Sequence, residues 1–188
     1  MEAAIVSKET IQHKIYTVRG YKVMLDVDLA EMMDSFVDKE DNGWLMYNTK
    51  YCAADLAYSE IYGQAKKTIY VVDNYIGLRT LVLLKNAPAG VDITLFSDNV
   101  GNRLHKVEYN DFLREYPGIQ LKIKKTRGIY HDRFIVLDYG TKEERIFLCG
   151  ASSKDAGARV TCIVEDFGIE KYKGLIDELL KNKELVLG

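Results

Sequence analysis

The sequence predicts an α/β fold, with a mixed β-sheet covered by helices on both faces and a small N-terminal β-hairpin and helix beside it. Two observations predict the sheet. Segments with helical apolar spacing alternate with short β-branched segments from about residue 46 to the end of the chain. Several of the short segments are apolar at consecutive positions, which is typical of strands buried on both faces. The 188 residues suffice for one such domain and a short appendage.

The elements of the main domain follow from apolar periodicity and from the residues that end helices. Strands are expected at residues 68–72, 91–96, 120–125, 133–138, 145–149 and 160–164. Helices are expected at residues 51–64, 76–85, 104–116 and 170–183. The second helix is followed by Pro88 and Gly90 and the third by Pro117 and Gly118, and both residue types end helices.

The first 37 residues are expected to form a separate N-terminal segment, joined by a linker at residues 38–45 to the main domain at 46–188. Residues 14–18 and 21–25 have strand patterns and are joined by an Arg-Gly pair, which favours a tight hairpin. A short helix with acidic residues in its first turn should follow. A hairpin and one helix are too small to fold alone, so we expect this segment to dock on the main domain or on a second chain.

The composition excludes several classes of protein. The net charge of −2 and the pI of about 6.0 are not those of a generally basic nucleic-acid-binding protein, so any such binding requires a local patch. The 3 cysteines show no zinc-ligand spacing, and neither a metal nor a cofactor is expected. The N-terminus has no apolar signal segment, and no apolar run approaches the roughly 20 residues of a membrane span. We therefore expect a cytoplasmic protein with no membrane partner.

A histidine and an arginine precede the most apolar expected strand. Positions two apart in a strand share a face, so His131 and Arg133 should project together from its start. A guanidinium offers a planar fork of donors that keeps its charge. An imidazole can act as a nucleophile or proton carrier near neutral pH. The pair therefore predicts a phosphate-handling site.

The surrounding residues resemble the phospholipase D superfamily. The spacing His-x-Arg-x4-Asp, from His131 to Asp138, resembles the family signature His-x-Lys-x4-Asp, and the glycine- and serine-rich residues 150–157 follow after one strand. With residues 72–76, these motifs resemble phospholipase D-like domains of bacterial and phage-borne DNA-associated regulators. The resemblance implies a phospholipase D-like fold for residues 46–188. One motif per chain implies that a complete site would need a symmetric homodimer.

The resemblance also implies roles for individual residues. His131 would be the nucleophile and Arg133 the phosphate clamp, whereas Asp138 would be structural because its parity puts it on the opposite face from His131. Asp73 would orient the imidazole as an acidic partner. Phosphate oxygens would be bound by a set of residues in two loops: Tyr75, Ser152, Ser153 and Lys154. Alternatively, the serines cap a helix and the Asp73 segment is an ordinary strand-end turn.

Residues 15–31 resemble the opening of a phage-regulator DNA-binding domain related to KilA-N, of the Orf-six-N type. The resemblance stops after these residues, so the domain would be truncated. It implies a phage, prophage or mobile-element regulator.

Three functions remain open. The first is a module that binds phosphate or nucleic-acid backbone, DNA or RNA, with degenerate catalysis because Arg133 replaces the signature lysine. The second is a metal-independent, dimeric nuclease with a His131 nucleophile. The third is a dimerisation domain with a vestigial pocket. A cluster of Lys122, Lys124, Lys125 and Arg127 is either a nucleic-acid track towards His131 or a solvated strand face.

Overall fold

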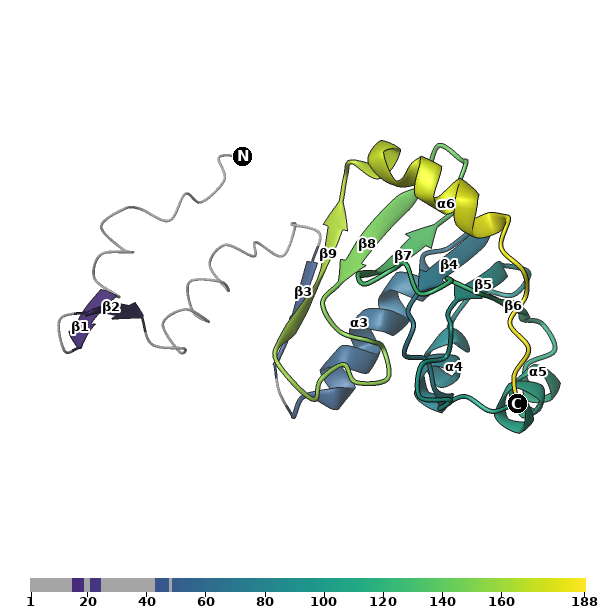
Figure 1. Cartoon of the computed structure of the whole chain (residues 1–188), viewed down its shortest axis with the longest axis horizontal. Coiled ribbons are helices and arrows are strands. Elements are labelled where there is room, and N and C mark those ends of the chain that lie inside the picture. Colours follow the sequence, from purple (N-terminus) through teal and green to yellow (C-terminus); the bar gives the residue numbers. More distant parts are fainter. Residues whose placement is uncertain (1–14, 19–20, 25–42, 48) are drawn as a thin grey trace. The chain divides into compact units, whose positions relative to one another are not determined.

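The computed structural model describes residues 15–18, 21–24, 43–47 and 49–188. Residues 1–43 and residues 44–188 form two compact units, and each is considered by itself. Figure 1 shows the elements of both. The expected linker at residues 38–45 stays a prediction, because most of those residues lie outside the described ones.

The first unit contains an antiparallel hairpin. Strand β1 (Ile15–Val18) pairs with β2 (Tyr21–Met24), so that Val18 lies opposite Tyr21 and Ile15 opposite Met24. Both strands lie where the sequence predicts them. The expected helix at 26–32 lies outside the described residues.

The second unit is built on a seven-stranded mixed sheet with the strand order β3-β9-β8-β7-β4-β5-β6. The strands are β3 (Gly43–Met46), β4 (Thr68–Val72), β5 (Asp92–Phe96), β6 (Gln120–Lys124), β7 (Arg133–Leu137), β8 (Arg145–Cys149) and β9 (Thr161–Asp166). Strands β4, β5 and β6 are parallel to one another. Strand β7 is antiparallel to β4 and to β8, and β9 is antiparallel to β8. All strands but β3 lie within a residue or two of their predicted positions.

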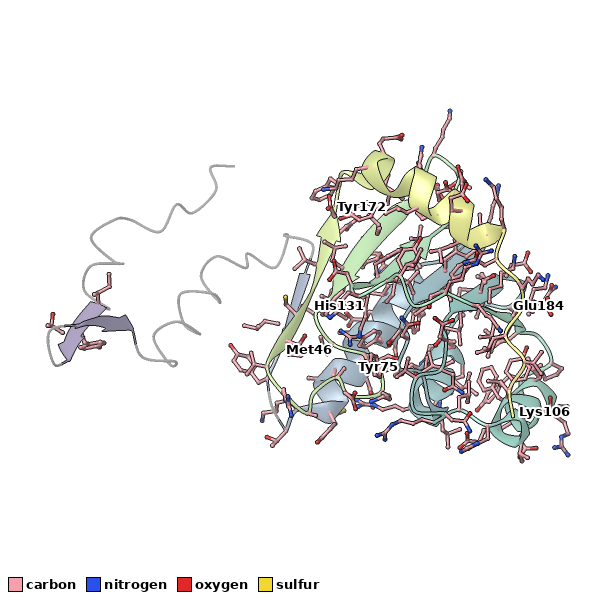
Figure 2. The ribbon with its side chains drawn as sticks, viewed as in Figure 1. Met46, Tyr75, Lys106, His131, Tyr172 and Glu184 are labelled. Carbon is pink, nitrogen blue, oxygen red and sulfur yellow. The ribbon has the colours of Figure 1, made fainter. Side chains whose placement is uncertain are left out.

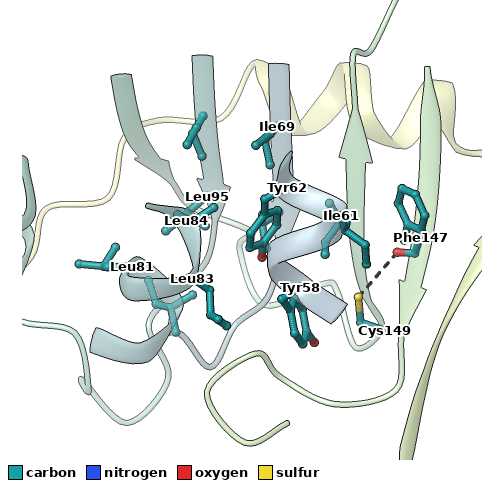
Figure 3. Packing of buried hydrophobic residues seen from close by; sticks show 14 of the residues in the cluster. Tyr58, Ile61, Tyr62, Ile69, Leu81, Leu83, Leu84, Leu95, Phe147 and Cys149 are labelled. Atoms are coloured by element: carbon teal, nitrogen blue, oxygen red, sulfur yellow. Dashed lines mark hydrogen bonds between the residues drawn. The ribbon is translucent and has the colours of Figure 1, made fainter. Parts of the chain in front are cut away.

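Helices cover both faces of the sheet, as predicted. They are α3 (Tyr51–Gly63), α4 (Leu78–Leu84), α5 (Lys106–Glu115), the 3₁₀ turn η1 (Ile169–Tyr172) and α6 (Lys173–Leu180). One apolar cluster joins one sheet face to α3, α4 and α5. Figure 3 shows Tyr62 of α3 near Leu84 of α4, and Tyr58 of α3 near Leu83 of α4. A second cluster joins the other face to α6, through Ile176 among others.

Successive residues of the central strands belong alternately to the two clusters, because both faces of the sheet are buried. In β4, Val71 belongs to the cluster under α3, whereas Val72 belongs to the cluster under α6. In β7, Ile135 belongs to the cluster under α3, whereas Phe134 belongs to the cluster under α6. This alternation explains the consecutive apolar positions in the sequence.

Strand β3 is the element that the sequence analysis missed. Its residues fall at the end of the expected linker, and only Met46 of the four is buried. A four-residue strand that is half-buried at the sheet edge carries too short a pattern to separate it from the polar run before it.

The segment after α6 lies along β6, the strand at the other edge of the sheet. The N–H of Lys125 donates to the carbonyl of Lys183 (3.0 Å), and the N–H of Leu185 donates to the carbonyl of Ile123 (2.9 Å). An antiparallel bridge joins Lys124 to Glu184. The C-terminal residues therefore occupy the outer edge of β6 (Figure 1).

Asp138 ties the end of β7 to the start of β4. Its carboxylate is 3% exposed and accepts hydrogen bonds from the backbone N–H groups of Lys66, Lys67 and Thr68, at 2.6 to 3.1 Å. The residue lies at the opposite end of β7 from Arg133. Asp138 is therefore structural, as the sequence predicts.

Replacing Asp138 by alanine is expected to lower the free energy of unfolding by about 3 kcal/mol, because three backbone donors lose their acceptor. Urea unfolding followed by circular dichroism measures the change. The matched control is Asp92→Ala: Asp92 is exposed, and its carboxylate has no hydrogen bond in the described chain. The control should stay within about 0.5 kcal/mol of the wild type. Equal losses in the two variants would contradict the assigned role.

Candidate phosphate-binding site

Three segments that are far apart in the sequence meet at one end of the sheet. Strand β7 is antiparallel to both neighbours, so it begins where β4 and β8 end. Phe134 lies opposite Val72 of β4, and Arg133 lies opposite Cys149 of β8. The residues that follow β4 and β8 are therefore brought beside Arg133.

Asp73 is the polar centre of this end of the sheet. Its carboxylate is 3% exposed. One oxygen, Oδ1, accepts the N–H of Tyr75 at 2.9 Å and lies 3.5 Å from Nε of Arg133. The other, Oδ2, accepts the hydroxyl of Ser152 at 2.6 Å. Both oxygens are thus used to join the loop after β4 to β7 and to the loop after β8.

The guanidinium of Arg133 is held on one side and open on the other. Nε is buried and makes no hydrogen bond, so its contact with Asp73 is an ion pair without hydrogen-bond geometry. The guanidinium carbon lies 5.4 Å from the ring centre of Tyr75, within reach of a cation–π contact. The two Nη groups make no hydrogen bond to any described residue, and neither is a buried atom. They can therefore donate to an incoming anion.

His131 lies just before β7 rather than within it. The strand begins at Arg133, and His131 is exposed in the loop that leads into it. Its imidazole makes no hydrogen bond or ion pair with the described residues. The carbonyl of the preceding residue, Tyr130, accepts a hydrogen bond from the side-chain amide of Asn74 at 3.0 Å. The backbone that carries His131 is therefore anchored, whereas its imidazole is free.

The expectation that Asp73 orients the imidazole is not met in this structure. The contacts of Asp73 are with Arg133, Ser152 and Tyr75, and no hydrogen bond or ion pair joins it to His131. The physical reason is position. Asp73 is buried at the end of β4, whereas His131 lies outside the sheet ladder and exposed to solvent.

The loop that leads to His131 is held by Asp98, which follows β5. The carboxylate of Asp98 accepts the hydroxyl of Thr126 at 2.6 Å and the N–H groups of Thr126 at 3.0 Å, Arg127 at 3.2 Å and Gly128 at 2.5 Å. The N–H of Asp98 in turn donates to Oδ1 of Asn74 at 3.0 Å. Burial acts to raise the pKa of Asp98, but the hydrogen bonds from Thr126, Gly128 and Arg127 outweigh it and lower the pKa below its ordinary value.

The serines after β8 are buried, and their expected contact with phosphate stays a prediction. Ser152 is buried and its hydroxyl lies within hydrogen-bond distance of Asp73 and of the carbonyl of Tyr75. Ser153 is also buried, 3.0 Å from the hydroxyl of Thr80. The ammonium of Lys154 pairs with the adjacent Asp155. These side chains therefore shape the loop, whereas Tyr75 lies at the rim with its side chain 41% exposed.

Arg79 and Gly157 fix the path of the same loop. Nη1 of Arg79 donates to the carbonyls of Lys154 (3.1 Å) and Ala156 (2.8 Å). Gly157 has φ +82°, and a Cβ there would lie 2.8 Å from the backbone Cα of Tyr51. The loop must therefore carry glycine at this position.

Cys149 is beside Arg133 but is not a candidate nucleophile. The thiol is buried, and its Sγ lies 3.8 Å from the carbonyl of Phe147 (Figure 3). Burial raises the pKa of Cys149 to about 12, and the negative charge of Asp73 acts in the same direction. The thiol therefore stays protonated at neutral pH.

A cleft of about 660 Å³ opens beside the site on the α6 side of the sheet. Its polar end is formed by His131, Asp132 and Arg133. The remainder is lined mainly by apolar side chains of β7, β8, β9 and α6 and by Tyr172. Figure 2 labels His131, Tyr75 and Tyr172 among the side chains of this unit. The predicted pair of His131 and Arg133 therefore does line one cavity.

Sequence reasoning missed the residues that support the site. Asn74, Asp98, Thr126 and Arg79 were assigned no role, although Asn74 directly follows Asp73 in the motif that carries the family resemblance. In the residues that the structure describes, no group of three or more His, Cys, Asp or Glu residues could hold a metal ion. No helix among those residues is both long and apolar enough to cross a membrane.

No family model and no curated protein matches the sequence. The chain is similar to NucT from Helicobacter pylori, with a TM-score of 0.53 and 16% identity over 78% of this chain and 100% of that chain. It is also similar to TrmBL2, an archaeal chromatin protein whose structure shows a novel mode of DNA binding. That match has a TM-score of 0.50 and 15% identity, and it covers 85% of this chain and 60% of TrmBL2. The fold is phospholipase D-like, as predicted.

Replacing Asp98 by asparagine is expected to destabilise the protein by about 2 kcal/mol at neutral pH, because the charged acceptor of several hydrogen bonds is lost. Since folding lowers the pKa of Asp98, its contribution is present above the ordinary carboxyl value of 3.8 and is lost as the pH falls through the lower folded value. Urea unfolding at a series of pH values should therefore show the two proteins converging in acid. A constant difference at every pH would contradict this role.

Proposed function

We propose that residues 46–188 bind the phosphate backbone of nucleic acid through Arg133, in a phospholipase D-like site whose catalysis is degenerate. The proposal rests on the contacts that the guanidinium of Arg133 makes and on those that it leaves open. Asp73 and Tyr75 hold one side of it, and both Nη groups are left without a partner among the described residues. Two parallel N–H donors match the oxygens of a phosphate, and the contact is charge-assisted.

Pre-orientation makes Arg133 suited to binding. A free arginine side chain loses rotamer entropy when it binds a ligand, whereas Arg133 is already held between a buried carboxylate and an aromatic ring. Its side chain is 25% exposed, so the desolvation that remains on binding is modest. The free imidazole of His131 at the same cleft supplies a further donor to a phosphate oxygen.

The fold supports nucleic acid as the source of the phosphate. TrmBL2, an archaeal chromatin protein that binds DNA, shares this fold with the chain. The N-terminal hairpin is present where the sequence resembles the opening of a KilA-N-related domain. We therefore propose a nucleic-acid-associated regulator of phage type that acts as a homodimer.

Replacing Arg133 by alanine is expected to weaken binding of a fluorescent oligonucleotide about tenfold or more, because a bidentate ionic contact is lost. The slope of log affinity against log salt should fall by about one. Arg133→Lys keeps the charge but loses the fork, so its affinity should lie between the two.

Fluorescence anisotropy at several salt concentrations measures both quantities. The control is Arg114→Ala: Arg114 is an exposed arginine on α5 whose one ion pair within the described residues is with Asp111. An Arg133→Ala variant that binds like the control would rule out this site.

The second candidate function is a metal-independent nuclease. It is favoured by the free, exposed imidazole of His131 beside the phosphate clamp. The imidazole would attack phosphorus, forming a P–N bond and breaking the P–O bond to the leaving alcohol. A second histidine would protonate the departing oxygen to give the alcohol, and water would then hydrolyse the phosphohistidine. We propose that the same histidine of a second copy supplies the proton in a symmetric dimer.

Cleavage of DNA and RNA in EDTA distinguishes the two functions. For a binding module, we expect no cleavage by the wild type, although both nucleic acids bind. Cleavage that persists in EDTA and disappears in His131→Ala would establish the nuclease and would show that arginine can replace the signature lysine.

A further inference from the structure

The cleft beside the proposed phosphate site has an aromatic interior. The ring of Phe134 lies 6.3 Å from that of Tyr130 and 6.0 Å from that of Tyr172. The hydroxyl of Tyr130 donates to the carbonyl of Leu175 at 3.2 Å, and the hydroxyl of Tyr172 donates to Asp166 at 2.9 Å. Both tyrosine rings are therefore tethered at their polar ends, and their apolar parts line the cavity.

The cleft is open and of a size that suits a small ligand. Its volume of about 660 Å³ lies within the range of ligand pockets. Two of its apolar side chains, Val164 and Leu175, are 46% and 48% exposed, so the wall is accessible from solvent. One end is polar and the rest is apolar. This arrangement fits a ligand that carries a phosphate next to a flat, largely apolar group.

A group of exposed cations lies on the loop and the sheet edge that lead to this cleft. The basic strip consists of Lys122, Lys125, Arg127 and Lys183, which are exposed and make no ion pair within the described part of the chain. Arg127 precedes His131 by four residues, so their Cα atoms are at most about 15 Å apart. The hydrogen bonds to Asp98 hold this connection in place. The strip therefore provides positive charge outside the cleft, in a chain whose net charge is −2.

We propose that the cleft binds an unpaired base of a single-stranded nucleic acid, with the adjacent phosphate at the free imidazole of His131, which lines the cleft, and further phosphates at Arg133 and along the basic strip. This inference rests on the proposed function, because it uses the same phosphate contact. A base inside a duplex is stacked and cannot enter such a cavity, whereas an unpaired base can stack on aromatic side chains. A phospholipid would also bring an apolar group beside a phosphate. The phospholipid would make no contact with the basic strip, however, whereas the row of phosphates in a nucleic acid matches this row of cations.

Cysteine reactivity in the unmodified protein tests the inference directly. Cys162 is exposed and lines the cleft, Cys52 is exposed on α3 against the opposite sheet face, and Cys149 is buried. Oligothymidylate should slow the alkylation of Cys162 by N-ethylmaleimide and leave Cys52 unchanged, as followed by mass spectrometry. An abasic oligomer of the same length carries the same phosphates and should not protect Cys162.

A pair of variants tests the aromatic contact. Tyr172→Leu removes a ring from the cleft, whereas Tyr116→Leu removes a partly buried ring at the end of α5. Tyr172→Leu should weaken oligothymidylate binding about tenfold and leave binding of the abasic oligomer unchanged, because stacking on one base contributes of that order. Tyr116→Leu should bind both oligomers like the wild type.

The outcomes separate this inference from the proposed function. Equal binding of the abasic oligomer and oligothymidylate, with no protection of Cys162 and with both weakened by Arg133→Ala, would overturn the base site and keep the phosphate site. Binding that Arg133→Ala leaves unchanged would overturn the phosphate site itself. Protection of Cys162 by a short-chain phospholipid and not by oligothymidylate would assign the cleft to lipid.

Discussion

The candidate site depends on how one buried carboxylate, that of Asp73, is satisfied. A charge removed from water is costly unless it is paired and hydrogen-bonded. Asp73 meets this requirement with groups from three segments: the N–H of Tyr75, the hydroxyl of Ser152 and the guanidinium of Arg133. The end of β4, the start of β7 and the loop after β8 are thereby held together. Because Nε of Arg133 faces Asp73, the two Nη groups of the guanidinium are left without a partner among the described residues.

Arg133, which stands where the phospholipase D signature that this motif resembles has a lysine, makes contacts that depend on its guanidinium. A guanidinium can contact Asp73 through Nε, lie against the ring of Tyr75 and keep two Nη donors for a ligand. An ammonium is a compact point charge that cannot divide its contacts between a carboxylate, a ring and a phosphate in this way. Arginine at this position therefore suits its neighbours. A lysine at position 133 would leave Asp73 without a partner of the same reach.

Most of the fold could be predicted from the sequence, but only part of the site could. Strands β4 and β8 match their predicted bounds because continuous apolar runs are local and unambiguous. The pairing of His131 with Arg133 followed from spacing, although β7 begins only at Arg133. The role of Ser152 could not be predicted, because its hydroxyl bonds a residue 79 positions away. The same is true of Asp98 and its partners, since hydrogen bonds between distant loops leave no periodic pattern.

The edge of the sheet at β6 is closed to other chains. An edge strand with free N–H and carbonyl groups is a template on which another strand can add, and this leads to aggregation. At β6 the C-terminal residues occupy that place through the bonds of Lys125 and Leu185. The lysines of β6 oppose strand addition as well, because their charges would be brought together with those of a second copy. Lys122, which belongs to the basic strip that would attract a polyanion, thus also helps to prevent strand addition at this edge.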